Sequence, residues 1–370
     1  VPPPRQAVRL PGAVPGLPDP EITEIPIPRG QDGGDTATAC CRLTRYRYPD
    51  SPHPPVVLIH GYSASGTTFA HPQVRPNLAT YLWHQQRDVW ILDLRSSSGA
   101  RTATVNYRFE DLAFGDIPAA IEHICRRAPA PSVDVIAHCM GAAMFSMAVL
   151  ANRGNSPYHE ALRRLPGRVH SAVLSQVGPL VSMAPDNVFR AYVFSYLKYF
   201  LPLEDYSFEP EGDGSIRDEV LDRLLASLPY TDREFDLENP CIPWRRTDFT
   251  TARHRMDLLY GRTFSLENLG PGALEHINDL FGPFNVDSAT QVAHFARSQC
   301  ITDHGGNNTF VSRQRLRDRW RFPTLSLHGR ENGLADVRTL GRMAEILGDA
   351  GCRWESREFP CFGHQDSLIG

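Results

Sequence analysis

Cys139 carries the clearest chemical signature in the sequence. It lies in the pentapeptide Ala-His-Cys-Met-Gly (137–141), directly after the apolar run 133–136 and before a second apolar stretch. Small residues around a nucleophile allow a strand to turn sharply into a helix, an arrangement called a nucleophile elbow that usually carries serine. The turn also places the sulfur at a helix N-terminus, which favours an anion and predicts a thiol pKa below the free value of about 8.5. The pattern therefore predicts a cysteine nucleophile.

Candidate partners of this cysteine follow two later predicted strands. Glu331, Asn332 and Asp336 come after the strand 323–329, and His364 comes after the last predicted strand, 353–359. The order nucleophile, acid position, histidine is typical of a hydrolytic triad on an α/β sheet. We therefore predict His364 as the catalytic histidine, with Asn332 as its orienting residue and Glu331 and Asp336 as rivals for that role.

Two backbone N–H groups are expected to stabilise a developing oxyanion. His60-Gly61-Tyr62 follows the apolar run 56–59, and Met140 follows the nucleophile. The N–H groups of Tyr62 and Met140 are predicted as this pair of donors. His60, His138 and His328 are interpreted as structural residues.

The elements that must position these residues are apolar strands separated by helices. Strands are predicted near 56–59, 88–93, 133–136, 169–175, 323–329 and 353–359, with helices at 78–86, at 116–127 and after the elbow. Fully apolar strands that alternate with helices indicate a parallel sheet covered on both faces, with ligands at the carboxyl ends of its strands. Two shorter strands are predicted near 22–27 and 36–48.

The alternation is interrupted once, which predicts the domain organisation. Residues 1–20 contain seven prolines and are expected to form an extended linker or arm. Residues 21–175 and 322–370 are expected to form the core. Residues 176–321, which include helical patterns at 189–200 and 216–228, are expected to form an inserted helical cap.

Composition excludes several classes of function. Hydrophobic residues make up 41% and charged residues 22%, with a net charge of -4 and no long basic block, so a nucleic-acid partner is not predicted. No apolar run approaches the roughly 20 residues of a membrane span. The eight cysteines have no paired CxxC spacing, so no metal and no cofactor are predicted. A free catalytic thiol in a long chain favours the cytoplasm.

From about residue 55 onward the sequence resembles the α/β hydrolases. Asp88–Arg95 (D-V-W-I-L-D-L-R), 333–337 and His364-x-Asp366 are similar to acid lipases of the lysosomal and gastric kind. A-H-C-M-G (137–141), D-I-P-A-A (116–120), W-R-R-T (244–247), Y-G (260–261), H-I-N-D-L-F-G-P-F-N (276–285) and H-G-R-E-N (328–332) are similar to hydrolase domains fused to cholesterol-oxidase-like oxidoreductases. The resemblance implies an α/β-hydrolase fold and a possible fusion or association with such an oxidoreductase. It implies no flavin here, because this chain has no glycine-rich dinucleotide motif.

The position that matches the usual acid is Asn332, a departure that fits the cysteine. A serine nucleophile needs a carboxylate to stabilise the imidazolium, and an Asn there costs about 10⁴ in rate. A thiolate can instead rest beside an imidazolium whose ring is oriented by an amide oxygen, as in Cys-His-Asn enzymes.

The sequence thus predicts a hydrolase that cleaves an ester, thioester or lactone through an acyl group bound to Cys139, with a bulky apolar substrate. Two alternatives remain open. The first is an acyltransferase or polyester enzyme that uses the same cysteine, as in the polyhydroxyalkanoate enzymes of this fold. The second is a binding domain without catalytic activity.

Overall fold

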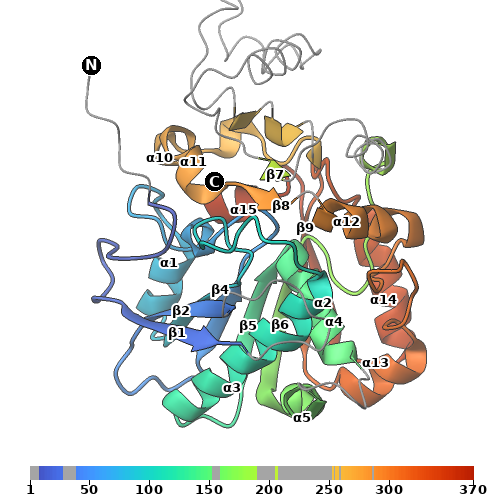
Figure 1. Cartoon of the computed structure of the whole chain (residues 1–370), viewed down its shortest axis with the longest axis horizontal. Helices are drawn as coiled ribbons and strands as arrows, with labels where there is room; N and C mark the ends of the chain where they lie inside the picture. Colours follow the sequence, from blue (N-terminus) through green and yellow to red (C-terminus); the bar gives the residue numbers. More distant parts are fainter. Residues whose placement is uncertain are drawn as a thin grey trace, which may run out of the picture.

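A single mixed sheet forms the framework of the molecule (Figure 1). The computed structural model describes residues 8–27, 39–151, 159–189, 205–206, 252–253, 255–257, 260–285 and 287–370. Within them the sheet has eight strands in the order β1-β2-β4-β3-β5-β6-β9-β10. The strands are β1 (Glu21–Pro26), β2 (Cys40–Tyr46), β3 (Val56–Ile59), β4 (Val89–Asp93), β5 (Val133–His138), β6 (Val169–Ser175), β9 (Thr324–Gly329) and β10 (Trp354–Phe359).

The strand directions confirm the predicted parallel sheet. β2 pairs antiparallel with β1 and β4, and the neighbours from β4 to β10 all pair in parallel. The central strands are buried on both faces; β3 and β4, for example, have no exposed residue. This burial explains why their sequences read as continuous apolar runs.

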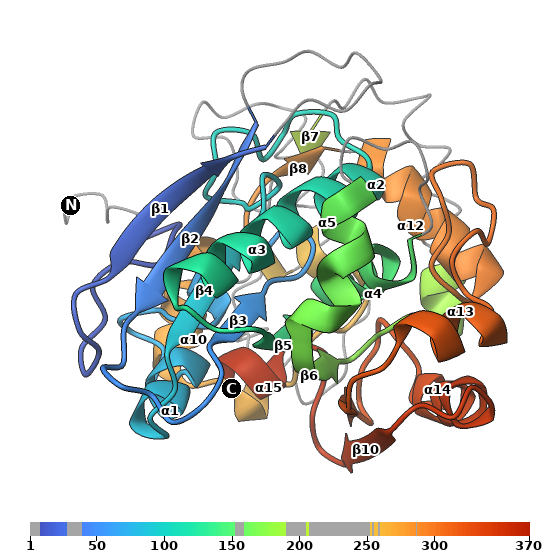
Figure 2. The same cartoon turned by 90° about the horizontal axis from the view of Figure 1, so that it is seen from below.

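Helices cover both faces of the sheet (Figure 2). One face carries α3 (Ile117–Arg127) and α4 (Met140–Leu150), and the opposite face carries α1 (Leu78–His84) and α15 (Asp366–Ile369). α4 packs in turn against α13 (Arg313–Arg319), and α13 against α14 (Arg338–Asp349). α13 therefore packs with the core, although it lies before residue 322, where the core is predicted to resume. No described helix is long and apolar enough to cross a membrane.

The described part of the predicted cap lies beyond one end of the sheet (Figure 1). It contains α10 (Pro271–Glu275), α11 (Ile277–Leu280), α12 (Asp287–Ser298) and a two-stranded sheet of β7 (Asp205–Tyr206) and β8 (Phe284–Asn285). The helices predicted at 189–200 and 216–228 fall almost wholly outside the described residues.

The proline-rich segment is irregular, as its composition predicts, but its described part packs on the core. The Tyr46 hydroxyl donates to the Gly12 carbonyl at 2.6 Å, and Arg42 donates to the Pro11 carbonyl at 2.8 Å. Val14 is buried. Residues 8–20 are therefore part of the packed domain and do not form a free arm.

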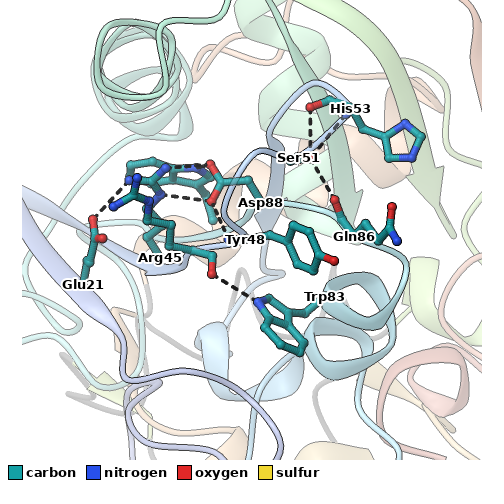
Figure 3. A network of polar contacts seen from close by, with 10 residues as sticks. Glu21, Arg45, Tyr48, Ser51, His53, Trp83, Gln86 and Asp88 are labelled. Carbon is teal, nitrogen blue, oxygen red and sulfur yellow. Dashed lines mark hydrogen bonds and ion pairs between the residues drawn. The ribbon is translucent and has the colours of Figure 1, made fainter.

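An ion-pair network joins the antiparallel strands β1 and β2 to Asp88, just before β4 (Figure 3). Arg45 on β2 donates through Nε and a terminal nitrogen to both oxygens of Asp88, each at 3.0 Å, and to Glu21 of β1 at 3.1 Å. The pair is buried, so the two-pronged geometry offsets the cost of removing both charges from water. Next to it, Trp83 of α1 donates to the Arg47 carbonyl at 3.2 Å.

Candidate active site

Cys139 connects β5 to α4 in a strained conformation. Its φ of 54° and ψ of −129° are unusual for a residue with a side chain. The turn needs glycine nearby, because a Cβ at Gly141 would lie 2.4 Å from the His60 carbonyl oxygen. A Cβ at Gly61 would lie 2.9 Å from the Cβ of Cys139. The backbone at this position therefore has the geometry of a nucleophile elbow.

The two predicted oxyanion donors both lie next to Cys139. The backbone N–H groups of Met140 and Tyr62 interact with the Cys139 sulfur. The loop that carries Tyr62 is held by the buried His60, whose Nε2 accepts from the Leu94 N–H at 3.2 Å and whose Nδ1 lies 2.8 Å from the Gly61 carbonyl oxygen. His60 thus links the oxyanion loop to the end of β4.

The prediction of a lowered pKa for the Cys139 thiol is wrong. Burial raises the pKa of the Cys139 thiol to about 11, although the Met140 and Tyr62 N–H groups lower it. Cys139 itself is only 6% exposed, so little water can solvate a thiolate at the N-terminus of α4. Desolvation outweighs the helix dipole, and Cys139 rests as a neutral thiol.

This pKa predicts how Cys139 reacts with iodoacetamide. The rate should rise about tenfold per pH unit from pH 7 to pH 10, because only the thiolate reacts and its fraction grows tenfold per unit below the pKa. Peptide mapping after timed alkylation measures this rate, with the exposed Cys361 in the same digest as an internal reference. A rate that is already constant at pH 7 would contradict the raised pKa.

Asn332 is the one of the three candidate orienting residues that contacts His364. Its Nδ2 lies 2.9 Å from His364 Nδ1. Glu331 is exposed, and Asp336 accepts from the backbone and side chain of Arg338 at 2.8 and 2.9 Å. The geometry of the described residues therefore favours Asn332 over its two rivals.

The amide of Asn332 faces His364 through its nitrogen and not through its oxygen, contrary to the sequence-based expectation. Asn332 Oδ1 accepts from the N–H groups of Leu334 and Ala335 at 2.9 and 3.0 Å. Its Nδ2 donates to Gln176 Oε1 at 3.0 Å. Two backbone donors already occupy the oxygen, so the NH2 group is left for the ring.

His364 follows β10 as predicted and is fully buried. Burial lowers its pKa well below the usual value, and the neighbouring His138 and His328 lower it further. Among the described residues its Nε2 has no hydrogen-bond partner. The ring of His138 lies edge-on to the ring of His364, with centroids 5.1 Å apart. The Nδ1 of His138 lies 3.0 Å from Ser175 Oγ. His364 is therefore a neutral ring at rest.

Asp366 fixes the loop that carries His364. Its carboxylate accepts from the Gly363 N–H at 2.9 Å, from the Ser265 N–H at 3.1 Å and from Asn268 Nδ2 at 2.6 Å. Ser265 and Asn268 belong to the segment before α10. One carboxylate therefore holds both the loop that carries His364 and the described cap.

Cys139 and His364 line the same apolar cavity. Core residues such as Met140, Ala143 and Leu334 form part of its wall. Residues of the predicted cap, including Met256, Phe281 and Phe295, form the rest. The cavity lies between the described core and cap, and its lining suits an apolar ligand.

Gln176 is a site residue that the sequence reasoning missed. It follows β6, is buried, and has a φ of 76°. Its Oε1 accepts from the Gly329 N–H at 3.0 Å as well as from Asn332, and its Nε2 lies 3.4 Å from the Gly363 carbonyl oxygen. Its place at the carboxyl end of a central strand is the only sequence signal that could have found it.

One group of three described residues has the composition of a metal site. Ligand atoms of His71, His276 and Asp279 lie within 4.8 Å of one another. The Gln73 N–H donates to His71 Nδ1 at 3.2 Å, so the neutral ring carries its proton on Nε2, which faces Asp279 at 3.3 Å. A metal-bound histidine instead donates from its second nitrogen. The group is explained by hydrogen bonds that join the loop before α1 to the cap.

Comparison with known proteins agrees with this fold. Residues 54–209 match the model of a family described as the alpha/beta hydrolase fold. Carboxylesterase CesB (YbfK) from Bacillus subtilis is 13% identical over 95% of this chain and 87% of its own, with a TM-score of 0.50. A soluble variant of monoglyceride lipase from Saccharomyces cerevisiae, in complex with a substrate analog, is 12% identical over 94% and 89%, with a TM-score of 0.51.

No curated protein matches the chain. The family model, the strand order and the similar structures together define the class: the chain has the α/β-hydrolase fold.

Proposed function

We propose that this protein is a hydrolase of carboxylic esters or related acyl compounds that forms an acyl-enzyme on Cys139. The observation that carries the proposal is the position of Cys139: a strained elbow at an apolar cavity, with the N–H groups of Met140 and Tyr62 directed at its sulfur. The apolar wall supports a substrate with a bulky apolar acyl group.

The proposed reaction has two halves. The Cys139 sulfur attacks the acyl carbonyl carbon, the bond to the leaving group breaks, and a thioester to Cys139 forms. The N–H groups of Met140 and Tyr62 stabilise the negative oxygen of the intermediate, a contribution of about 2.7 to 4 kcal/mol per donor in other enzymes. Hydroxide from water then attacks the carbonyl carbon of this thioester, the carbon–sulfur bond breaks, the acid leaves and the Cys139 sulfur regains its electron pair as a thiolate. Transfer to another alcohol or thiol would make the same site an acyltransferase, and the acceptor alone distinguishes the two activities.

A second candidate function is binding of an apolar acyl compound without turnover. It is favoured by two specific observations: burial raises the Cys139 pKa to about 11, and the Asn332 amide presents a donor to His364. Both disfavour the ion pair that activates a cysteine nucleophile.

A trapped acyl group separates the two functions. We expect intact protein incubated with acyl thioesters, nitrophenyl esters and lactones of increasing chain length to gain the mass of one acyl group, located on the peptide that contains Cys139. The Cys139→Ala variant, which keeps the cavity, should gain none. A protein that binds these compounds in calorimetry but never gains mass would instead be a binding domain.

A further inference from the structure

The orientation of the Asn332 amide is determined by its surroundings. Turning the amide over would bring its NH2 group against the N–H groups of Leu334 and Ala335, which now donate to Oδ1. It would also bring Oδ1 against Gln176 Oε1, which the Gly329 N–H holds in place. Such a turn leaves buried donors and acceptors unpaired, at about 1 to 3 kcal/mol each.

This orientation determines where His364 carries its proton. Nδ1 accepts from Asn332 Nδ2, so the proton of the neutral ring lies on Nε2. A ring with this proton cannot accept a second one at Nε2. A proton added at Nδ1 would point at the Nδ2 hydrogen that Asn332 donates to this atom. His364 can therefore act as a hydrogen-bond donor, while the usual exchange of a proton between nucleophile and leaving group is blocked.

We propose that the site selects acyl donors whose leaving group departs as a stable anion, with thioesters as the substrate class. This inference rests on the proposed function of Cys139 and names its substrate. The same reasoning explains the cysteine: a thiol ionises without help far more readily than a serine hydroxyl, so Cys139 needs no base that the site lacks.

Once the Cys139 thiol has lost its proton to solvent, its acylation by a thioester balances without a proton transfer inside the site. The thiolate form of Cys139 attacks the carbonyl carbon, the carbon–sulfur bond of the substrate breaks, and the leaving thiolate takes the electron pair and the charge. A free thiol has a pKa of about 8.5, so its thiolate is a stable product in water. The conjugate acid of an alkoxide has a pKa near that of water, about 15.7, so an alkoxide must be protonated as it leaves. His364 in its resting form does not supply that proton.

Gln176 acts in this scheme as a positioning residue. Its backbone lies in a region that side chains rarely adopt, and its amide oxygen receives both the Gly329 N–H and the Asn332 Nδ2. Because Gln176 Oε1 is a fixed acceptor, the side chain at position 332 must present a donor to it, as an amide does and a carboxylate does not. We therefore relate the strained backbone of Gln176 to the presence of an amide at position 332.

Nitrogen NMR tests the proton position without requiring activity. Protein with ¹⁵N-labelled histidine is compared with the His364→Gln variant, so that the signals of His364 are identified by their loss. We expect a protonated Nε2 and an unprotonated Nδ1 from pH 6 to pH 9. A proton on Nδ1 in the wild-type protein would overturn the inference, whatever the protein catalyses.

Kinetics test the substrate class. The rates with an acyl thioester and with the alkyl ester of the same acid are measured in the wild type and in Asn332→Asp. Comparing the ratio of the two rates between the two proteins cancels the intrinsic difference in reactivity of the substrates. We expect the thioester-to-ester ratio of kcat/KM to be at least about 100-fold higher in the wild type. A change in the activation of Cys139 affects both donors and cancels in the ratio, whereas protonation of the leaving group affects the ester alone, within the total of about 10⁴ for the correct tautomer. Equal ratios overturn the selection of thioesters. If neither donor acylates Cys139, the proposed function fails while the NMR result still decides the proton position.

Discussion

Asn332→Asp should increase the hydrolysis of a simple alkyl ester by about 10³- to 10⁴-fold, the size of the loss when a triad Asp becomes Asn elsewhere. One carboxylate oxygen can keep the Leu334 and Ala335 N–H groups. The other can accept a hydrogen bond from His364 Nδ1, at the cost of the hydrogen bond that Asn332 now donates to Gln176 Oε1. Nε2 is then left with a lone pair and can accept a proton. The new carboxylate also favours the imidazolium and raises the pKa of His364 from its low value.

The pH profile separates this mechanism from a general improvement in folding. The wild-type rate should rise about tenfold per pH unit towards the Cys139 pKa of about 11, since only thiolate reacts. The variant should reach its plateau near neutral pH, because its histidine accepts the thiol proton. Asn332→Ala is the matched control: it removes the donor without adding a base, and should show no such plateau. An unchanged profile in Asn332→Asp would contradict the proposed role of the amide.

Cys139→Ser should abolish acylation in the wild-type background and restore it in the Asn332→Asp background. A hydroxyl cannot ionise unaided near neutral pH, and His364 with its proton on Nε2 does not act as its base. With Asp at position 332 the site becomes a Ser-His-Asp triad. The cost of the serine should therefore fall from at least about 10³-fold to about 10-fold or less.

The four proteins form a double-mutant cycle, measured as acylation rates with a nitrophenyl ester by stopped flow. Strong coupling between positions 139 and 332 is the expected result. Cys139→Ala in both backgrounds gives the rate that is independent of the nucleophile. Additive effects would show that the cysteine and the asparagine act independently. The chemistry of Cys139 would then not depend on the geometry of the Asn332 amide.

Most of the fold could be predicted from the sequence because the signals are local. The strands β3, β4, β5, β6, β9 and β10 lie within two residues of their predicted ends. Strands buried on both faces, such as β3 and β4, must be apolar throughout, whereas the edge strand β10 has no buried residue and mixes polar with apolar side chains. The elbow could be located because a sharp strand-to-helix turn demands small residues, here Gly141. The packing of residues 8–20 on the core could not, because proline content shows only that regular structure is absent.

The candidate site divides in the same way. The sequence by itself determined which residues reach the carboxyl edge of the sheet: Cys139, Asn332 and His364 each follow a strand, and chain order places them. The tertiary structure alone decided their chemical states. Burial of Cys139 by surrounding elements raises the pKa of its thiol. Backbone N–H groups of Leu334 and Ala335, together with Gln176 from another strand, turn the Asn332 nitrogen towards His364. Desolvation and hydrogen-bond direction depend on atoms that are remote in the sequence, whereas the strand and turn signals lie in neighbouring residues.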